Sequence, residues 1–588
     1  MFSESESLRK SQYETYLVSA FIILISVLIG TIVLLSWVPP VSRDALTHHL
    51  AVPKLYLQNG AIYEIPSIGF SYYPMNLDLL YIIPLYFGSD IAPKFIHFIF
   101  ALLTAWLIYG YLVKRLGVLW ALFGALFFLS VPIIVKLSIT VYVDLGLIFF
   151  STASILGLLK WIDSRFQLKF LILSAVCCGL ALGTKYNGLL VLFILTVFIP
   201  FVFISISKKT LNKKKPANKG QSIKIQFKAV SFGAIFCAVA LLVFSPWMIR
   251  NYIWKDNPVY PLYDSFFQNL KTLSKETANG ISENSLVETR IQTSQDSSTR
   301  WGPFAVRKVI YGESWWEIAL IPIRIFFQGQ DDHPKYFDGK LSPFLFLLPF
   351  FAFIQFKNNP ATLRTEKKFL AFFAIIYLLY AFSQYSIRIR YIAPIIPPLV
   401  ILASFGLHQI AGMVTNRGAD KTGWIGTGSI LLMATILLSY NALYILKQFS
   451  SVDPISYVTG RVPRDAYIAK YRPEYTIYQY ANHHLPDRVK ILGLFLGNRR
   501  YYSERELIFG VDLFKKIVNS AESEEVLFND LRENGFTHLI IRYDLFNQWT
   551  NKQFDDSKKQ LLKVLFAGHL KHLLSQDGYG LFELRNIQ

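Results

Sequence analysis

Long apolar runs, separated by short basic segments, are the feature that most constrains how this chain can fold. A run of about 18 or more apolar residues is long enough to cross a bilayer as a helix. The sequence predicts eleven such spans, over roughly 16–38, 92–112, 117–135, 142–159, 168–184, 187–206, 229–247, 342–356, 369–385, 391–412 and 424–446. The predicted fold class is therefore a polytopic α-helical membrane protein with about eleven transmembrane helices.

The composition agrees with this interpretation. Hydrophobic residues make up 53% of the chain and charged residues only 17%, whereas a soluble domain is about 25% charged. The first run is too long for the core of a signal peptide and no small-residue cleavage site follows it, so we expect a retained anchor. The three cysteines fall inside apolar segments, so no disulfide framework is expected.

Basic residues set the predicted orientation. The net charge of +20 would indicate a nucleic-acid partner in a soluble protein, but here the excess lies largely between the apolar runs. Alternation of the spans places one set of basic connections on a common side, which the positive-inside rule makes cytoplasmic: 9–10, 114–115, 160–169, 207–228, 357–368 and 417–421. The eight lysines of 207–228 are interpreted as a topology signal and as contacts to anionic lipid. No nucleic-acid partner is expected.

The larger hydrophilic pieces then face the opposite side. These are the loops 40–91 and 248–341, and everything from residue 447 onward. We predict a transmembrane domain over 1–446 and a soluble extracytoplasmic domain over 447–588. The expected location is a cell membrane, plasma or bacterial inner, with the N-terminus cytoplasmic and the working surface outside. Part of the second loop, 270–300, is rich in Ser, Thr, Asn and Gln and is expected to be mobile.

The last 142 residues change to an ordinary soluble composition. Segments 490–497 and 537–543 have the character of short buried strands, and 579–585 that of a last strand. Residues 523–535 have the periodicity of a helix that ends at Gly535. Strand, helix and strand in succession predict a small α/β domain.

An acid and two histidines stand where the first span leaves the bilayer, in the sequence SRDALTHHL (42–50). Helical spacing over 40–60 places Asp44 and His48, four residues apart, on one face. A carboxylate at this depth indicates function by default. The alternative is that Asp44 caps the helix or pairs with Arg43.

Further charged groups also fall at the extracytoplasmic ends of spans: Asp144, Lys185, Arg250, Arg388 and Arg390. Together with Asp44 they provide acids that can take a proton from an attacking hydroxyl and cations that can stabilise a departing phosphate. Anchoring at the membrane interface is the alternative for Lys185 and for the arginines. For Trp315 and Trp316 in the second loop, the two alternatives are stacking on sugar rings and anchoring at the membrane interface.

The ordered set of segments resembles the GT-C superfamily of polytopic glycosyltransferases, in particular the bacterial branch related to protein O-mannosyltransferases and to the aminoarabinose transferase of lipid A. Asp44 with His48 and His49 is similar to the family's first-loop motif, an acid followed by a Tyr-His pair, with His48 at the aromatic position. The other similar segments are FSYYP (70–74), YVD (142–144), GLALGTK (179–185), PWMIRN (246–251), NPVYP (257–261) and RIRYIAP (388–394).

The resemblance implies a polyprenyl-phosphate-linked sugar donor and transfer with inversion at the anomeric carbon, within the cell envelope. It implies Asp44 as the catalytic acid/base and Asp144 as a second acid that orients the acceptor or a metal. Lys185 and Arg390 are implied contacts of the phosphate, and the remaining expected substrate contacts are His48, His49, Tyr73, Arg250 and Arg388. The acceptor, whether glycan, lipid or protein, and the identity of the sugar stay open.

No cofactor is predicted with certainty. Some members of the superfamily need a divalent cation, and His48, His49 and Asp144 are the residues available for one, but their spacing is not that of a metal site. Two other functions compete with sugar transfer by such an enzyme. A transporter or flippase of lipid-linked glycans should carry ionisable groups near the bilayer midplane, and a polymerase or ligase would use a different lipid-linked donor.

Overall fold

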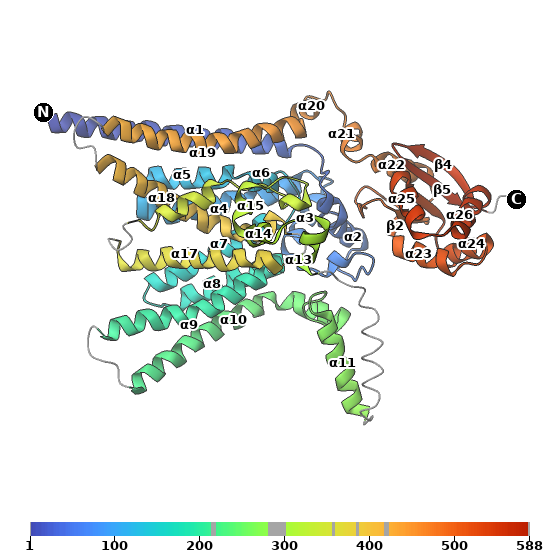
Figure 1. Cartoon of the computed structure of the whole chain (residues 1–588), viewed down its shortest axis with the longest axis horizontal. Coiled ribbons are helices and arrows are strands. Elements are labelled where there is room, and N and C mark those ends of the chain that lie inside the picture. The colour runs from blue at the N-terminus through green and yellow to red at the C-terminus, as the bar shows by residue number, and fades with distance from the viewer. Residues whose placement is uncertain are drawn as a thin grey trace.

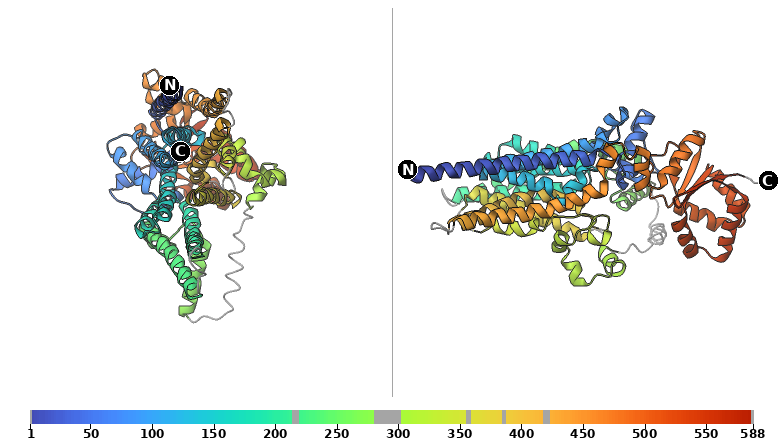
Figure 2. Two further views of the ribbon diagram at one scale, coloured as in Figure 1. Left: turned by 90° about the vertical axis from the view of Figure 1, so that its left-hand side faces the viewer. Right: turned by 90° about the horizontal axis from the view of Figure 1, so that it is seen from above.

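The computed structural model describes residues 2–212, 219–279, 302–354, 359–383, 387–416 and 423–585. Long helices lie side by side in a bundle, and a small domain with a sheet lies at one end of it (Figure 1). Seen from a second side, the first long helix and the last one of the bundle run along its length (Figure 2). The chain is thus a multi-pass helical membrane protein with a C-terminal α/β part, as predicted.

The bundle consists of α1 (Phe2–Ser36), α4 (Ala92–Leu116), α5 (Val118–Ser130), α6 (Pro132–Ser138), α7 (Asp144–Asp163), α8 (Leu168–Thr184), α9 (Gly188–Asn212), α10 (Lys219–Lys255), α16 (Phe344–Phe351), α17 (Ala361–Leu379), α18 (Ile396–Asn416) and α19 (Gly423–Val452). Within the described residues, six helical segments are long and apolar enough to cross a membrane, and a seventh is obtained if α5 and α6 count as one span. The eleven predicted spans all coincide with helix, but several are shorter or broken.

A proline explains the break between α5 and α6. The predicted span 117–135 bends by 65° between α5 and α6, because Pro132 lacks an N–H and Val131 before it takes an extended ψ of 128°. In the described part of the predicted span 342–356, which ends at residue 354, α16 has eight residues. The predicted span 369–385 is helical to Leu379 and continues as a 3₁₀ turn, Tyr380–Ser383.

Shorter helical segments connect the long helices. They are η1 (Ala45–His49), α2 (Ala51–Asn59), η2 (Gly69–Tyr72), α3 (Asn76–Tyr86), α11 (Asp264–Asn279), α13 (Pro303–Ala305), η3 (Val306–Ile310), α14 (Trp315–Ala319), α15 (Ile321–Phe327), η4 (Pro334–Tyr336) and η7 (Ile389–Ile395). The helix expected over 40–60 is therefore a π-helical turn followed by α2. Of the segment expected to be mobile, residues 280–300 lie outside the described part, as do 213–218 of the lysine-rich connection.

The C-terminal part begins with α20 (Pro454–Val458), α21 (Arg464–Tyr471) and α22 (Glu474–His484). It continues through β1 (Lys490–Leu494), β2 (Glu506–Phe509), α23 (Val511–Ser520), α24 (Glu524–Glu533), β3 (His538–Arg542), α25 (Tyr543–Gln553), α26 (Asp556–Gly568), β4 (Leu570–Gln576) and β5 (Tyr579–Leu584). The sheet order is β2-β1-β3-β5-β4. β1 is parallel to β2 and β3, whereas β5 is antiparallel to β3 and β4.

Strand alternation gives this sheet a core on each face. Ile491 and Ile540 pack with α22 on one face, while Leu492 and Leu539 pack on the other face in a cluster with residues of α23, α24 and α26. The predicted α/β character of the C-terminal part is confirmed. β2 and β4 were not predicted, because β2 has only four residues and β4 is largely exposed.

Candidate active site

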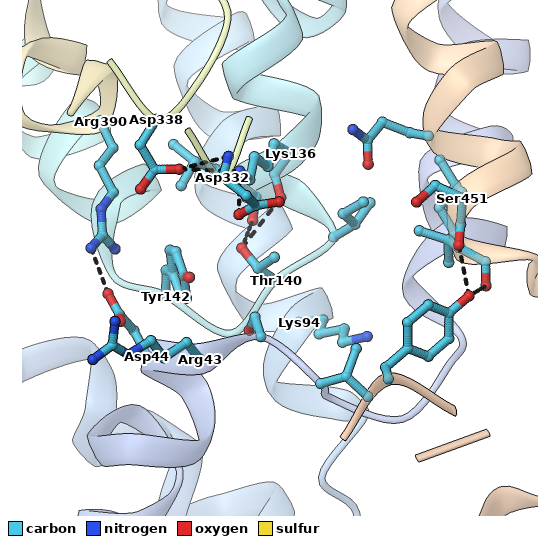
Figure 3. A pocket seen from close by; sticks show the side chains of 18 of the residues that line it. Arg43, Asp44, Lys94, Lys136, Thr140, Tyr142, Asp332, Asp338, Arg390 and Ser451 are labelled. Atoms are coloured by element: carbon cyan, nitrogen blue, oxygen red, sulfur yellow. Dashed lines mark hydrogen bonds and ion pairs between the residues drawn. The ribbon is translucent and has the colours of Figure 1, made fainter. Parts of the chain in front are cut away.

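Two cavities lie where the bundle meets the C-terminal part. The larger has a volume of about 730 Å³ and the smaller of about 430 Å³. Both are lined by the same four charged residues, Arg43, Asp44, Arg388 and Arg390. The smaller cavity is seen from close by in Figure 3, with Asp44 and Arg390 at one side of it. These residues therefore form a wall that the two cavities share.

Asp44 and Arg390 make an ion pair in this wall. The Nη2 atom of Arg390 donates to Oδ2 of Asp44 at 2.5 Å, and their side chains are 9% and 17% exposed. Burial opposes ionisation, but the charge of Arg390 holds the pKa of Asp44 well below its usual range. Asp44 makes no side-chain capping bond to η1, so the capping alternative is wrong. Its ion-pair partner is Arg390 rather than Arg43.

The π-helical turn η1 follows Asp44 and directs both histidines inward. Nδ1 of His49 lies 2.7 Å from Oδ1 of Asp78 in α3, and the ring of His48 stacks on Phe70 with centroids 4.4 Å apart. Burial favours the neutral forms of both Asp78 and His49. It raises the pKa of Asp78 to about 7 and lowers the pKa of His49 to about 3. Nδ1 of His48 is buried without a hydrogen-bond partner in the described part.

Asp78 was missed by sequence reasoning. It is 2% exposed and lies in the apolar helix α3, NLDLLYIIPLY. A lone acid in an apolar segment is a signal of function, and that signal was available here.

Asp144 and Lys185 form a second ion pair, behind the larger cavity. Nζ of Lys185 lies 2.6 Å from Oδ1 of Asp144, whose side chain has no exposed surface. Lys185 itself lines the larger cavity, and its ammonium group lies 5.3 Å from the ring centre of Tyr391. Asp144 does not line either cavity, so within this arrangement it acts on the site through Lys185.

Arg250 supports the site from outside. Its Nη2 donates to the backbone oxygen of Tyr73 at 3.1 Å, and its guanidinium lies between the rings of Trp247 and Trp254, at 4.5 and 4.9 Å from their centres. Tyr73 lines the larger cavity but Arg250 does not. The structure thus brings together seven of the predicted site residues as cavity lining and places Asp144 and Arg250 behind them: Asp44, His48, His49, Tyr73, Lys185, Arg388 and Arg390 are the seven.

The smaller cavity has mixed charge. Lys136 lies within 3.2–3.6 Å of the carboxylates of Asp331, Asp332 and Asp338, and Arg388 lies 3.4 Å from Asp338. Figure 3 shows Lys136, Asp332 and Asp338 close to one another on one side and Lys94 on another. The C-terminal part contributes Tyr467, Tyr471 and Arg472. Trp315 and Trp316 are 63% and 65% exposed and line neither cavity.

A known protein family matches part of the chain. Residues 57–253 match the family described as dolichyl-phosphate-mannose-protein mannosyltransferase. This stretch is a glycosyltransferase domain. The matched stretch of this glycosyltransferase includes Tyr73, Asp144 and Lys185, whereas Asp44 and Arg390 lie outside it. No curated protein matches the sequence.

Solved structures share the fold of this glycosyltransferase over nearly its whole length. ArnT from Cupriavidus metallidurans, in the apo state, has a TM-score of 0.53 and 12% identity, with 97% of this chain and 98% of ArnT covered. ArnT bound to undecaprenyl phosphate has the same TM-score and identity, with 95% and 97% covered. The oligosaccharyltransferase of Archaeoglobus fulgidus, in complex with Zn and sulfate, has a TM-score of 0.50 and 11% identity, with 95% and 73% covered.

Among the described residues, the acids at the cavities are paired with cationic side chains. In the described ranges, no group of three His, Cys, Asp or Glu side chains is placed to hold a metal ion. Asp44 and Asp144 each bind a cationic side chain, and that cation takes the place that a metal would need. The described residues therefore offer no fitting set of donors for the divalent cation that the sequence left open.

Proposed function

We propose that this glycosyltransferase moves a sugar from a polyprenyl-phosphate-linked donor to an acceptor hydroxyl on the extracytoplasmic side of the membrane, with inversion, and that Asp44 is the base. The observation that carries the proposal is the position of Asp44 in the wall between two cavities, paired with an arginine. The excess of basic residues at the other end of the bundle supports the orientation.

The larger cavity suits the donor. Its side toward α9 is apolar, with Leu189, Leu190 and Phe193, and the ring of Phe193 is 63% exposed on the outside of the bundle. The same lining includes the cations Lys185 and Arg390. An isoprenoid chain matches the apolar residues and a phosphate matches the cations. The ArnT structure with undecaprenyl phosphate shares this fold and supports the same class of ligand.

The smaller cavity suits the acceptor, because charged and hydroxyl side chains form part of its lining and because it reaches Asp44 from the other side of the wall. The acceptor oxygen attacks the anomeric carbon as the bond from that carbon to the phosphate oxygen breaks. The bonding electrons leave with the phosphate, and the hydroxyl proton goes to the carboxylate of Asp44. Attack from the side opposite the leaving group inverts the anomeric configuration.

Arg390 links the base to the leaving group. Its Nη2 binds Asp44, whereas its Nε is buried without a hydrogen-bond partner in the described part of the chain. A guanidinium has five N–H donors, so Arg390 has donors beyond the one bound to Asp44, and these would bind the phosphate. As negative charge develops on the phosphate, it competes with Asp44 for the guanidinium, and the carboxylate becomes a stronger base.

A transfer assay with purified protein tests the proposal. The donors are undecaprenyl phosphate mannose and undecaprenyl phosphate glucose, each labelled in the sugar, and the acceptors are the envelope lipids and glycans of a deletion strain. Asp44→Asn should lower turnover by a factor of about 10² to 10⁴, the usual contribution of a general base. Asp544→Asn, which changes an exposed carboxylate in the C-terminal part, is the matched control and should retain turnover.

Two results would contradict the proposal. Wild-type turnover by Asp44→Asn would remove Asp44 from the role of base. Movement of the donor across the membrane, without cleavage of its sugar–phosphate bond, would show a flippase instead. The anomeric configuration of the product, read by NMR from its coupling constant, tests inversion separately.

A further inference from the structure

The connection between β1 and β2 is unusual for parallel strands. Such strands need a crossover, which is usually a helix, but residues 495–505 make this crossover as an irregular loop without helix. We call residues 495–505 the tail loop. In the order β2-β1-β3, the chain passes from β1 to β2 on one side and later returns to β3 on the other side of β1. Open α/β sheets bind ligands at the carboxyl ends of strands where the strand order reverses in this way. The tail loop starts at this end.

The tail loop is bonded to the segment that carries Asp44. The backbone N–H groups of Arg500 and Tyr501 both donate to the oxygen of Leu46, each at 3.1 Å. The hydroxyl of Tyr502 donates to the oxygen of Pro40 at 2.8 Å. Leu46 lies within the π-helical turn η1, so the loop fixes this turn from the side opposite the bundle.

The backbone of the tail loop is held in a conformation that side chains rarely adopt. Phe495, Gly497 and Asn498 have φ values of 64°, 68° and 61°. Glycine and asparagine tolerate the left-handed region, but phenylalanine does not favour it. Arg499 anchors the loop through an ion pair with Glu474, whose side chain is 2% exposed. Strained backbone that is held by its surroundings in this way is concentrated at ligand sites.

Asn498 places a side chain of the C-terminal part at the larger cavity. It lines this cavity together with Asp44, His48 and Phe70. The amide of asparagine offers two donors and one acceptor, which is the combination that sugar hydroxyls require. The cations Lys185 and Arg390 provide for the phosphate of the donor, while Asn498 adds a neutral polar group to the same cavity.

We propose that the tail loop is part of the active site: it holds the turn that follows Asp44, and Asn498 binds the sugar of the donor. The proposal rests on the proposed function, since it assigns the larger cavity to a lipid-phosphate sugar. It makes the C-terminal part a determinant of sugar specificity rather than an appended domain.

The variant Asn498→Gly tests the side chain without disturbing the backbone, because glycine accepts a φ of 61°. We expect kcat/KM for the sugar donor to fall about tenfold, as for the loss of one or two hydrogen bonds. The inhibition constant of plain undecaprenyl phosphate, which has no sugar, should stay unchanged. Asn534→Gly, the same replacement at an exposed helix end of the C-terminal part, is the matched control and should leave both quantities unchanged.

Equal kcat/KM for Asn498→Gly and wild type would overturn the proposal while leaving the proposed function intact. A parallel loss of affinity for plain undecaprenyl phosphate would also overturn it, because the effect would not come from the sugar.

A labelling experiment tests the placement of residue 498 without any turnover. Asn498→Cys is introduced in a variant in which Cys177, Cys178 and Cys237 are replaced by serine, and is treated with a water-soluble maleimide. Undecaprenyl phosphate mannose should slow the labelling at least fivefold more than plain undecaprenyl phosphate. Equal rates with both lipids would show that residue 498 does not meet the sugar, even if the wild type transfers neither sugar to the acceptors tested.

Discussion

The buried pair of Asp144 and Lys185 allows a quantitative test of how the site is stabilised. Asp144 has no exposed side-chain surface and lies 2.6 Å from Lys185, while its Oδ2 has no hydrogen-bond partner among the described residues. Lys185→Met keeps a long unbranched side chain but removes the charge. The carboxylate is then left buried without Lys185, and the neighbouring Arg390 is already bound to Asp44. Breaking a buried pair in this way costs about 3–5 kcal/mol.

The opposite replacement should cost less. In Asp144→Asn the lysine remains 16% exposed at the cavity, where water can solvate it, and we expect a loss of roughly 1–2 kcal/mol. The double variant buries no unpaired charge, so its loss should be about 1–3 kcal/mol rather than the sum of the two single losses. The predicted coupling energy between the two positions is therefore at least about 1 kcal/mol, and about 3.5 kcal/mol from the middle of each range.

Unfolding of the four proteins by SDS in mixed micelles measures these free energies. The affinity of each protein for undecaprenyl phosphate is measured alongside, and should fall in both variants that lack Lys185 but not in Asp144→Asn. Additive losses in the double-mutant cycle would refute the reasoning, because they would show that Lys185 does not neutralise Asp144 in the folded protein.

Two further predictions concern pH. In Arg390→Gln, burial is no longer offset by the guanidinium, so the pKa of Asp44 rises and the acid limb of the kcat/KM profile should move to higher pH; an unmoved limb would show that another group is the base. The pKa of Asp78 is raised from 3.8 to about 7 in the folded protein, so the stability that its protonated form provides is present below pH 3.8 and is lost as the pH rises to about 7. Asp78→Asn, which stays neutral, should therefore gain about 3 kcal/mol of stability relative to wild type between pH 5 and pH 8, and equal pH dependence in SDS unfolding would contradict the assignment.

The sequence predicts the bundle well because apolar runs are a strong and local signal. Its errors lie where a second local signal opposes the first, as at Pro132, which divides a predicted span into two helices. The predicted span 342–356 is also wrong in length, since its segment is apolar but the helix α16 within it has eight residues. In the C-terminal part, the buried strands β1 and β3 were predicted, whereas the exposed β4 carries little pattern.

The candidate site was predictable only as a set of charges at the ends of spans. Asp44 and Arg390 were both predicted as site residues from the sequence. The sequence around each of them does not indicate that these two residues, 346 positions apart, form an ion pair. Asn498 was beyond reach, because an uncharged polar residue in a loop of a soluble domain is ordinary. Its importance comes from the docking of the tail loop on Leu46, which is a property of the tertiary structure alone.

The hydrogen bonds from Arg500 and Tyr501 to Leu46 also bear on when this protein becomes functional during its synthesis. Leu46 leaves the ribosome early, whereas its partners follow more than four hundred residues later, after all the long helices of the bundle. A chain interrupted before β1 has its membrane helices and most of the lining of the larger cavity, but nothing to hold the oxygen of Leu46. If the tail loop belongs to the active site as proposed, maturation of the site is thereby coupled to completion of translation.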